Sequence, residues 1–311
     1  RAWGGNRVGQ LGNGTNADRS IPGPVRGLSD ATSITATGAS AFTLLADGTV
    51  RAWGDNYEQQ LGVSGTVPFS SLPVGISGLS GVAMAAQGTA TKYALLADGT
   101  VWAWGNNFMG QLGSGMPVHD SSVPVRVRGI TGAVSITADG DTAYALLADG
   151  TILAWGDNYM GQLGNGNNDN SSTPVQVQGL AAVSSITARN GSAFALLKDG
   201  TVRAWGNGGY GQLGNGTNDD ASTPIPVKGI IGATSIAAGE SAAYALLRDG
   251  TVRAWGNNKH GELGNGSTSY AGAPVQVTGL TGVTSITVNG RAIFALMSDK
   301  SVRAWGASPH G

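Results

Sequence analysis

Several residue types and patterns are absent from this sequence, and each absence excludes a class of protein. The 311 residues contain no cysteine, which excludes disulfides, thiolate metal sites and cysteine nucleophiles. Charged residues make up only 12%, and the formal net charge is −1, so the composition gives no electrostatic reason to expect nucleic acid or an anionic membrane as a partner. No apolar run approaches the ~18–20 residues of a membrane-spanning helix. We therefore expect no nucleic-acid partner and no membrane insertion.

Glycine is abundant and recurs inside a long repeated string. The 52 glycines follow no Gly-X-Y period, so they indicate many tight turns rather than collagen. The string "RAWGDNYEQQLG" at 51–62 returns as "LAWGDNYMGQLG" at 153–164 and as "RAWGNNKHGELG" at 253–264. The tryptophans of the Ala-Trp-Gly core are spaced by 50 or 51 residues and are Trp3, Trp53, Trp104, Trp155, Trp205, Trp255 and Trp305. Such a period is typical of a solenoid or a propeller.

Each repeat contains four short β-rich segments. Examples are "TSITATG" at 32–38, "AFTLLADG" at 41–48, "TVRAWG" at 201–206 and "TPVQVQG" at 173–179. Four strands in about 50 residues are typical of one propeller blade. Asp-Gly pairs such as Asp47-Gly48 separate the second and third segments and predict type I′ hairpins, in which both central residues have positive φ. The last copy reads Asp299-Lys300.

These patterns predict an all-β protein, a β-propeller of four-stranded antiparallel blades that forms one domain over residues 1–311. The expected repeats lie near 1–50, 51–101, 102–152, 153–202, 203–252 and 253–302, and residues 303–311 start a further repeat. A six-bladed ring, in which the final "SVRAWG" is surplus, is preferred over a seven-bladed ring that lacks part of one blade. In the second case an exposed sheet edge would allow self-association. We expect each tryptophan to be a wedge between blades and the leucine of "GQLG" to hold the loop against the core.

The pattern "ALLxDGTVRAWGxNxxGQLGxG" with "TPVxVxGLxGVxSI" resembles the regulator of chromosome condensation repeat family, nearer to its bacterial members. The resemblance covers essentially the whole chain and implies a propeller that serves as a binding platform. Some members are exchange factors for the small GTPase Ran, and one bacterial branch consists of secreted β-lactamase inhibitors. A histidine that the family commonly carries before "ALL" is absent at every copy: Ser40, Thr91, Thr142, Ser192, Ala242 and Ala292.

The two variable positions inside "GNxxGQLG" are the candidate partner-binding residues. They differ in every copy, as loop residues do when the scaffold is fixed and the loops carry the function. Aromatic and methionine side chains there suit a protein partner, with charged neighbours setting register. The alternative is that these side chains fold back and cover their own blades. The predicted binding residues are Tyr57, Glu58, Phe108, Met109, Tyr159, Met160, Tyr210, Lys259 and His260.

A central funnel is the second place where a site is expected. Its mouth is predicted to hold charged residues from the short loops between first and second strands: Lys92, Asp141, Arg189, Glu240 and Arg291. Carboxylates there could act as general acids or bases if burial shifts their pKa. Asx-rich loops such as 164–172 are more typical of turns than of calcium sites. The histidines, His119, His260 and His310, lack metal-ligand spacing, so we expect no metal and no cofactor.

The function that this reasoning favours is a non-catalytic scaffold that engages a protein partner through the variable loops. One alternative is an inhibitor of a secreted enzyme, similar to the β-lactamase inhibitors. The other is an enzyme or small-molecule binder that uses the funnel. The sequence does not identify the partner. The cysteine-free composition, rich in Thr, Asn and Gly, favours an extracellular or cell-surface location, with the cytoplasm as the alternative.

Overall fold

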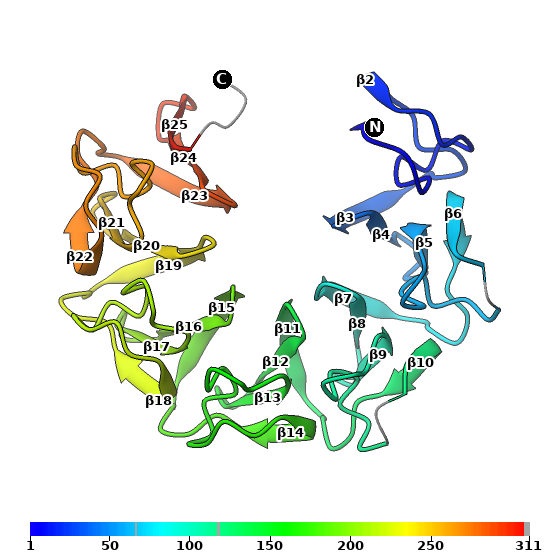
Figure 1. The fold of residues 1–311 in the computed structure, drawn as a ribbon, viewed down its shortest axis with the longest axis horizontal. Helices are drawn as coiled ribbons and strands as arrows, with labels where there is room; N and C mark the ends of the chain where they lie inside the picture. Colours follow the sequence, from blue (N-terminus) through cyan, green and yellow to red (C-terminus); the bar gives the residue numbers. More distant parts are fainter. Residues whose placement is uncertain (66, 117–118, 308–311) are drawn as a thin grey trace. The chain divides into compact units, whose positions relative to one another are not determined.

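The computed structural model describes residues 1–65, 67–116 and 119–307, and all regular elements in these ranges are β-strands. The strands form seven antiparallel sheets (Figure 1). Five sheets have four strands in chain order, one has two and one has three. The predicted all-β fold with four strands per repeat is therefore confirmed. Within the described residues, no helix is long and apolar enough to cross a membrane.

The chain divides into two compact units. The first comprises Arg1–Ala148, Trp155–Asp157 and Asn170–Val175. It holds three sheets, whose strands are β1 (Ala2–Gly4) and β2 (Arg19–Gly23); β3 (Ala31–Thr37), β4 (Ser40–Leu45), β5 (Val50–Asp55) and β6 (Phe69–Gly75); and β7 (Val82–Gln87), β8 (Thr91–Leu96), β9 (Val101–Gly105) and β10 (Ser121–Arg126).

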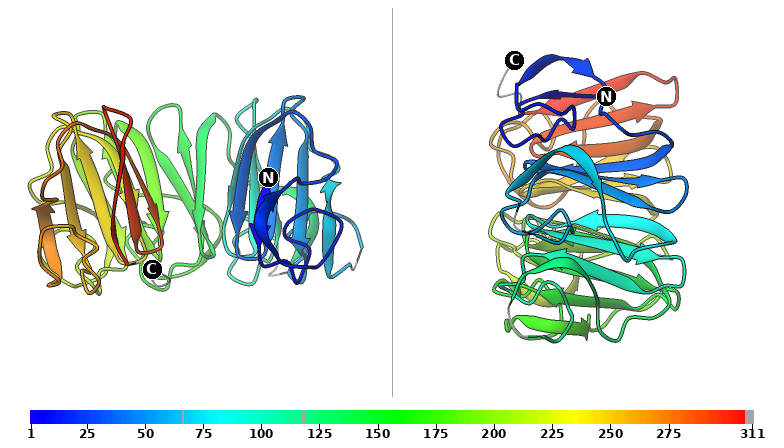
Figure 2. Two further views of the ribbon diagram at one scale, coloured as in Figure 1. Left: turned by 90° about the horizontal axis from the view of Figure 1, so that it is seen from above. Right: turned by 90° about the vertical axis from the view of Figure 1, so that its right-hand side faces the viewer.

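The second unit comprises Asp149–Ala154, Asn158–Asp169 and Gln176–Gly311. Its sheets are β15 (Val183–Arg189), β16 (Ser192–Leu197), β17 (Val202–Gly206) and β18 (Ala221–Pro226); β19 (Ala233–Ala238), β20 (Ala242–Leu247), β21 (Val252–Gly256) and β22 (Ala271–Gln276); and β23 (Val283–Asn289), β24 (Ala292–Met297) and β25 (Val302–Gly306). One further sheet contributes residues to both units and consists of β11 (Ala133–Asp139), β12 (Thr142–Leu147), β13 (Ile152–Gly156) and β14 (Ser171–Gln176). Figure 2 shows the strands of these sheets from two further directions.

The final "SVRAWG" is not surplus, and the seven sheets fit the second alternative, seven blades of which one is incomplete, rather than the preferred six. Residues Val302–Gly306 form β25, which pairs with β24 in the register Ala292↔Gly306 to Leu296↔Val302. At the other end of the chain, β1 and β2 form a two-stranded sheet. The six-blade preference assumed that "RAWG" at the start and "SVRAWG" at the end compete for the same place as the third strand of one blade. In the structure each has its own partner, because β1 pairs with β2 and β25 pairs with β24.

The hairpins between second and third strands are not type I′ turns. Gly48 has φ 75°, but Asp47 is absent from the positive-φ residues. The Asp47 carboxylate instead accepts hydrogen bonds from the Thr49 backbone (2.8 Å) and hydroxyl (2.6 Å), which hold the pKa of Asp47 below its usual value. The Gly48 N–H donates to the Leu45 carbonyl (3.0 Å). This is a three-residue hairpin loop that ends in a left-handed residue.

The last hairpin carries Lys300 where five sister turns have glycine, and the backbone is strained at this residue. Lys300 adopts φ 71°, a left-handed conformation that costs a residue with a Cβ roughly 1–2 kcal/mol. We expect Lys300→Gly to raise the free energy of unfolding by about 1 kcal/mol. Urea denaturation followed by circular dichroism measures it. Lys300→Ala is the matched control, since it removes the charge but keeps the Cβ, and an equal gain in that variant would contradict the explanation.

Six of the seven repeated tryptophans pack between sheets, as expected, whereas Trp3 is 60% exposed and is not a wedge. Trp255 of β21 is fully buried among Phe194, Leu196 and other apolar residues of the preceding sheet, and its ring meets that of Phe194 edge-on at 6.3 Å. Its indole N–H donates to the Gln212 carbonyl (2.7 Å) in the preceding "GQLG" loop. The same bond recurs from Trp53, Trp104, Trp155, Trp205 and Trp305. The loop leucines are buried too: Leu11, Leu61, Leu112, Leu163, Leu213 and Leu263.

The glycine after each repeated tryptophan except Trp3 is required by close backbone approach. Gly256 has φ +104°, and a Cβ there would lie 2.4 Å from the Ser241 carbonyl oxygen. That carbonyl accepts the N–H of Asn257 (2.8 Å), so the loop after the third strand starts beside the turn between the first and second strands. These two loops therefore emerge at the same end of a sheet.

Candidate functional site

A buried asparagine braces five of the six variable loops, and Gly208 stands in its place in the fifth copy. Asn258 is fully buried; its side-chain oxygen accepts the Leu263 N–H (2.9 Å), and its amide donates to the Ser267 and Ser269 carbonyls (2.9 Å each). The same bond to the loop leucine is made by Asn6, Asn56, Asn107 and Asn158. The asparagine of "WGxN" therefore closes the loop across its base, because one side chain satisfies several backbone groups at once.

The glutamine of "GQLG" fixes the backbone at the variable pair. In each described loop its side-chain oxygen, or that of Glu262 in the last, accepts the N–H of the second variable residue at 2.7–3.1 Å. In the five copies that have the buried asparagine, the two variable side chains are thus presented on a loop whose main chain is held at both sides. The sequence alone had suggested only that this loop varies.

The first variable position points to solvent. Tyr57, Phe108 and Tyr159 are 74%, 72% and 81% exposed. Arg7, Gly209 and Lys259 hold this position in the other copies and are exposed as well. Large aromatic side chains with this exposure bury little of their area against their own sheet, so the alternative that they cover their own blades does not describe them.

The second variable position contacts the following sheet. The Asn106 amide donates to the Glu58 carboxylate (2.8 Å), and the Asn170 amide donates to the Met109 sulfur (3.3 Å). His260 lies 3.4 Å from the Arg291 guanidinium. These contacts are with the following sheet and not with the residues' own blades, whereas Met160 and Tyr210 stay 36% and 54% exposed. Successive side chains of the braced loop point in different directions, the first to solvent and the second toward the next sheet. This difference is the signal that could have separated the two positions.

Two of the predicted funnel residues form an ion pair in the second unit. The Arg291 Nε lies 2.9 Å from a Glu240 carboxylate oxygen, and both side chains are nearly half exposed, so the pair contributes little stability, about 0–1 kcal/mol. The enclosed space that both residues line, beside Tyr244 and Glu262, has a volume of about 10 Å³. That is room for one water at most. Arg189 is exposed at the end of β15.

Asp141 is part of a series of hydrogen-bonded polar side chains in the first unit. Its carboxylate accepts from the Gln111 amide (3.2 Å), which also donates to Asn106 (2.7 Å). Burial raises the pKa of Asp141, and the charges of Asp157 and further carboxylates raise it more, whereas the Gln111 bond opposes them. A carboxyl with a raised pKa can exchange protons nearer to neutral pH, but within the described residues no second acid–base group bonds to it.

Lys92 is buried rather than exposed at a mouth. It lies on β8, only 1% exposed, and its Nζ has no hydrogen-bond partner among the described residues. Burial lowers the pKa of Lys92 to about 8, and the charge of Asp55 partly offsets the effect. The sister residues at this register are Ala41, Ala143, Ala193, Ala243 and Ile293.

Within residues 1–65, 67–116 and 119–307, no group of three His, Asp or Glu side chains could hold a metal ion. Asp residues of the Asx-rich loops accept backbone N–H groups instead; Asp18 bonds Asn6 and Asp220 bonds Gly208, both at 2.8 Å. His119 is exposed, and His310 lies outside the described residues.

Comparison with solved structures shows the fold that these sheets belong to. Human WBSCR16 superposes with a TM-score of 0.81 at 23% identity and covers 98% of this chain and 88% of its own. Prp20p of Saccharomyces cerevisiae gives a TM-score of 0.79 at 22% identity, with 98% and 80% covered. These similarities identify the fold as the propeller of RCC1-type proteins.

Curated relatives match by sequence over about half of this chain. The probable E3 ubiquitin-protein ligase HERC6 of Homo sapiens is 34% identical over 173 residues, which are 52% of this chain and 17% of that protein. The human E3 ubiquitin-protein ligase HERC2 is 34% identical over 172 residues, 53% of this chain and 4% of that protein. The chain thus spans less than a fifth of the length of either relative. A family model described as the RCC1-like domain matches residues 1–311, and the chain belongs to this RCC1-like family.

Proposed function

We propose that this chain is a protein-binding module and that Tyr57, Phe108 and Tyr159 are its anchor side chains. The single observation that carries the proposal is their exposure of 72–81% on braced loops. Tyrosine and other aromatics are enriched among the residues that dominate protein interfaces, because a large rigid ring buries much apolar area. Each ring exposes this apolar area to solvent, and a partner could bury it.

The rigidity of the loops supports the same role. Asn56 and Gln60 hold the backbone on either side of Tyr57 by bonds to the Leu61 and Glu58 N–H groups (both 2.9 Å). A side chain on a fixed backbone loses less conformational entropy on binding than one on a mobile loop. The braced loop therefore suits tight contact with a preformed surface.

The neighbouring residues would set orientation rather than supply most of the affinity. Glu58 and Lys259 place opposite charges beside two of the loops, and His260 is held near Arg291. Charged residues at an interface rim govern register and association rate more than affinity. Met109, Met160 and Tyr210 add apolar area at the second variable position.

Relatives give this proposal its context. The Prp20p structure is described together with binding properties to Gsp1p and histones, and another structure has Kap60 bound to yeast RCC1. We infer that this chain also engages a protein, of a kind these relatives do not specify. The extracellular or cell-surface location expected from composition remains a prediction.

Alanine substitutions at the anchors test the proposal. We expect immobilised wild-type chain to retain a protein from an extract of the source organism, and the variant Tyr57→Ala/Phe108→Ala/Tyr159→Ala to lose it. Each anchor should weaken the measured Kd by about tenfold or more, with the melting temperature unchanged because the rings touch little of the fold.

The matched control is Ile231→Ala. Ile231 is 77% exposed but lies between β18 and β19, at the opposite end of its sheet from the variable loop. The control should bind like wild type. A triple variant that retains the partner, or that unfolds at a lower temperature, would contradict the assignment.

A further inference from the structure

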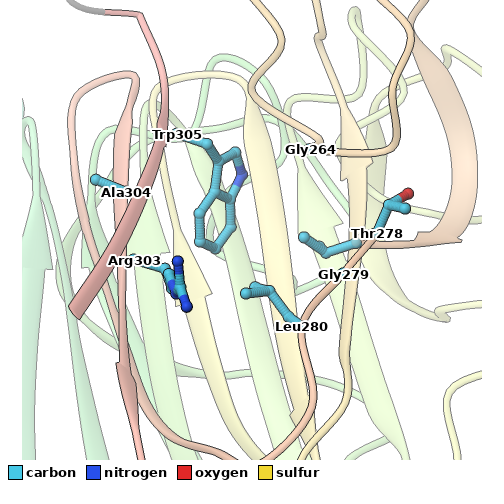
Figure 3. A pocket seen from close by; sticks show the side chains of 8 residues that line it. Gly264, Thr278, Gly279, Leu280, Arg303, Ala304 and Trp305 are labelled. Carbon is cyan, nitrogen blue, oxygen red and sulfur yellow. The ribbon is translucent and has the colours of Figure 1, made fainter. Parts of the chain in front are cut away.

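The boundary between the sheets β3–β6 and β7–β10, both in the first unit, is built less completely than its sister boundaries. In all six copies the last glycine of the "GQLG" loop lies against the tryptophan of the next sheet; Figure 3 shows this contact for Gly264 and the indole of Trp305. Between β3–β6 and β7–β10 the contact joins Gly62 and Trp104, and the Trp104 N–H donates to the Gln60 carbonyl (3.0 Å). We call this boundary the Trp104 seam.

The Trp104 seam holds a strained residue where its sisters have glycine. Gln59 adopts φ 60°, a left-handed conformation that is costly for a residue with a Cβ. In the next copy Gly110 has this place, and a Cβ there would lie 2.7 Å from the Ser172 Cα in the fourth strand of the following sheet. Glycine thus lets a loop approach the next sheet closely. The Cβ of Gln59 keeps its own loop from approaching in the same way.

Two backbone hydrogen bonds that hold the sister loops are absent from this loop in the part of the chain that the structure describes. In four copies a loop glycine donates its N–H to a carbonyl in the fourth strand of the next sheet, as Gly115 does to Ser172 (2.9 Å). In five copies the carbonyl of the last "GQLG" glycine accepts an N–H from the connection after the fourth strand, as that of Gly113 does from Arg128 (2.9 Å). The corresponding pairs without a bond are Gly65–Ser122 and Gly62–Ser77.

Buried polar groups without a partner lie on the face of β7–β10 that forms this seam. Trp104 marks the face, because its ring packs against that of Phe42 at 5.5 Å between centroids. Lys92 lies opposite Trp104 in register and Gln87 lies opposite Lys92, so these side chains share the face. The Lys92 Nζ and the Gln87 Oε1 are buried and have no hydrogen-bond partner among the described residues. The charge of Asp55, at the end of β5, acts on Lys92 from the other side of the seam.

These features all favour opening of this seam over opening of its neighbour. A buried polar group without a partner regains hydrogen bonds to water when the boundary opens, and a strained backbone relaxes. The boundary between β7–β10 and β11–β14, which we call the Trp155 seam, has Gly110 in place of Gln59 and Ala143 in place of Lys92. It also keeps both backbone hydrogen bonds of its loop.

We propose that the Trp104 seam is a built-in hinge, at which the sheets β3–β6 and β7–β10 separate locally while the strands of each sheet stay paired. On opening, the Lys92 ammonium and the Gln87 carbonyl reach water, and the Trp104 N–H leaves its acceptor. Local opening of this kind occurs where a boundary has few stabilising contacts.

The position of the hinge connects it to the variable loops. Tyr57 belongs to the loop on one side of the Trp104 seam and Phe108 to the loop on the other, and the bond from Asn106 to Glu58 crosses it (2.8 Å). Opening therefore changes the spacing of the two aromatic side chains. The opening itself needs no partner, so it can be tested on the free chain, and its failure would leave the proposed protein binding untouched.

Exchange of the indole protons, followed by NMR on the free chain, tests the hinge. Trp104 reports on its own seam, and Trp155, whose N–H donates to the Gln111 carbonyl (2.9 Å), reports on the sister seam. We expect Trp104 to exchange at least about tenfold faster than Trp155. In Gln59→Gly the Trp104 rate should fall by about fivefold or more, because the left-handed strain is removed, and the Trp155 rate should stay the same.

Acetylation of Lys92 by a small reagent, followed by mass spectrometry, gives a second readout, because its amine is buried in the closed seam. Lys92 should react more slowly than exposed Lys198 but without unfolding of the chain, and about fivefold more slowly still in Gln59→Gly. Gly110→Gln is the matched reverse variant, since it moves the strain to the sister seam. It should speed exchange at Trp155 and leave Trp104 unchanged, and circular dichroism checks that it folds.

Three results would overturn the proposal. One is equal exchange of the Trp104 and Trp155 indole protons in the wild-type chain. Another is a Trp104 rate that does not change in Gln59→Gly. The third is that Lys92 reacts only under conditions that unfold the whole chain, which would mean that the first unit opens as a single body.

Discussion

Trp255→Ala is expected to lower the free energy of unfolding by about 4 kcal/mol. Trp255 is fully buried and packs into the core of the preceding sheet. Its removal leaves a cavity that rigid strands on both sides fill poorly, and it leaves the Gln212 carbonyl without its indole donor. Because each sheet of a repeat protein is stabilised mainly by its neighbours, the loss should be concentrated in the sheets β15–β18 and β19–β22.

The chain itself provides the control for this variant. Trp3 occupies the same place in the repeat but is 60% exposed, so Trp3→Ala should change stability by less than about 0.5 kcal/mol. Urea unfolding measures both variants, and hydrogen exchange localises the effect. A loss below about 1 kcal/mol for Trp255→Ala, or equal losses for the two variants, would show that the tryptophans are not wedges.

Lys92→Met is expected to stabilise the protein at neutral pH. A buried ammonium without a hydrogen-bond partner is costly, and methionine keeps most of the side-chain volume without the charge. The lowering of the Lys92 pKa from its ordinary 10.5 to about 8 corresponds to a penalty on the order of 3 kcal/mol. Lys92→Ala, which restores the residue found in four sister strands, should gain less because it leaves a cavity.

The pH dependence of this effect has a definite sign. Between pH 8 and 10.5 the unfolded chain keeps the Lys92 proton and the folded chain has lost it, so the unfolded state binds more protons and stability rises with pH. The penalty is fully present below pH 8. The advantage of Lys92→Met should therefore shrink as the pH is raised from 8 to 10.5. Exposed Lys198 provides the control Lys198→Met, and a pH-independent difference for Lys92→Met would contradict the account.

The repeat itself made much of the fold predictable. A tryptophan every 50 or 51 residues, with four β-rich segments between successive tryptophans, leaves few folds other than a propeller. The structure confirms the strands, the packing of six tryptophans between sheets and the burial of the loop leucines. The hairpin type was predicted wrongly because the carboxylate of Asp47 binds Thr49, a side-chain effect that outweighs the Asp-Gly preference. The number of blades was left between six, which was preferred, and seven with one incomplete, because strand pairing at the chain ends is not encoded in the period; the seven sheets fit the second alternative.

The candidate site was less predictable, because side-chain direction depends on the folded loop. Tyr57 and Glu58 are adjacent in sequence, yet one faces solvent and the other bonds to the next sheet through Asn106. Lys92 was expected at a funnel mouth because it is charged and near a turn. Comparing the copies would have indicated otherwise, since Ala41 and Ala143 occupy its place on a buried strand face.

Site-specific photo-crosslinking tests the central claim, that the exposed aromatic positions are where a protein partner binds. A benzoylphenylalanine is placed singly at Tyr57, at Phe108 or at Lys198, which lies in the turn between β16 and β17 at the opposite end of its strands from the variable loop, and is irradiated in extracts of the source organism. The account predicts crosslinks to one and the same protein from Tyr57 and Phe108 and none from Lys198. No crosslinked protein at Tyr57 and Phe108, or the same products from all three positions, would contradict it.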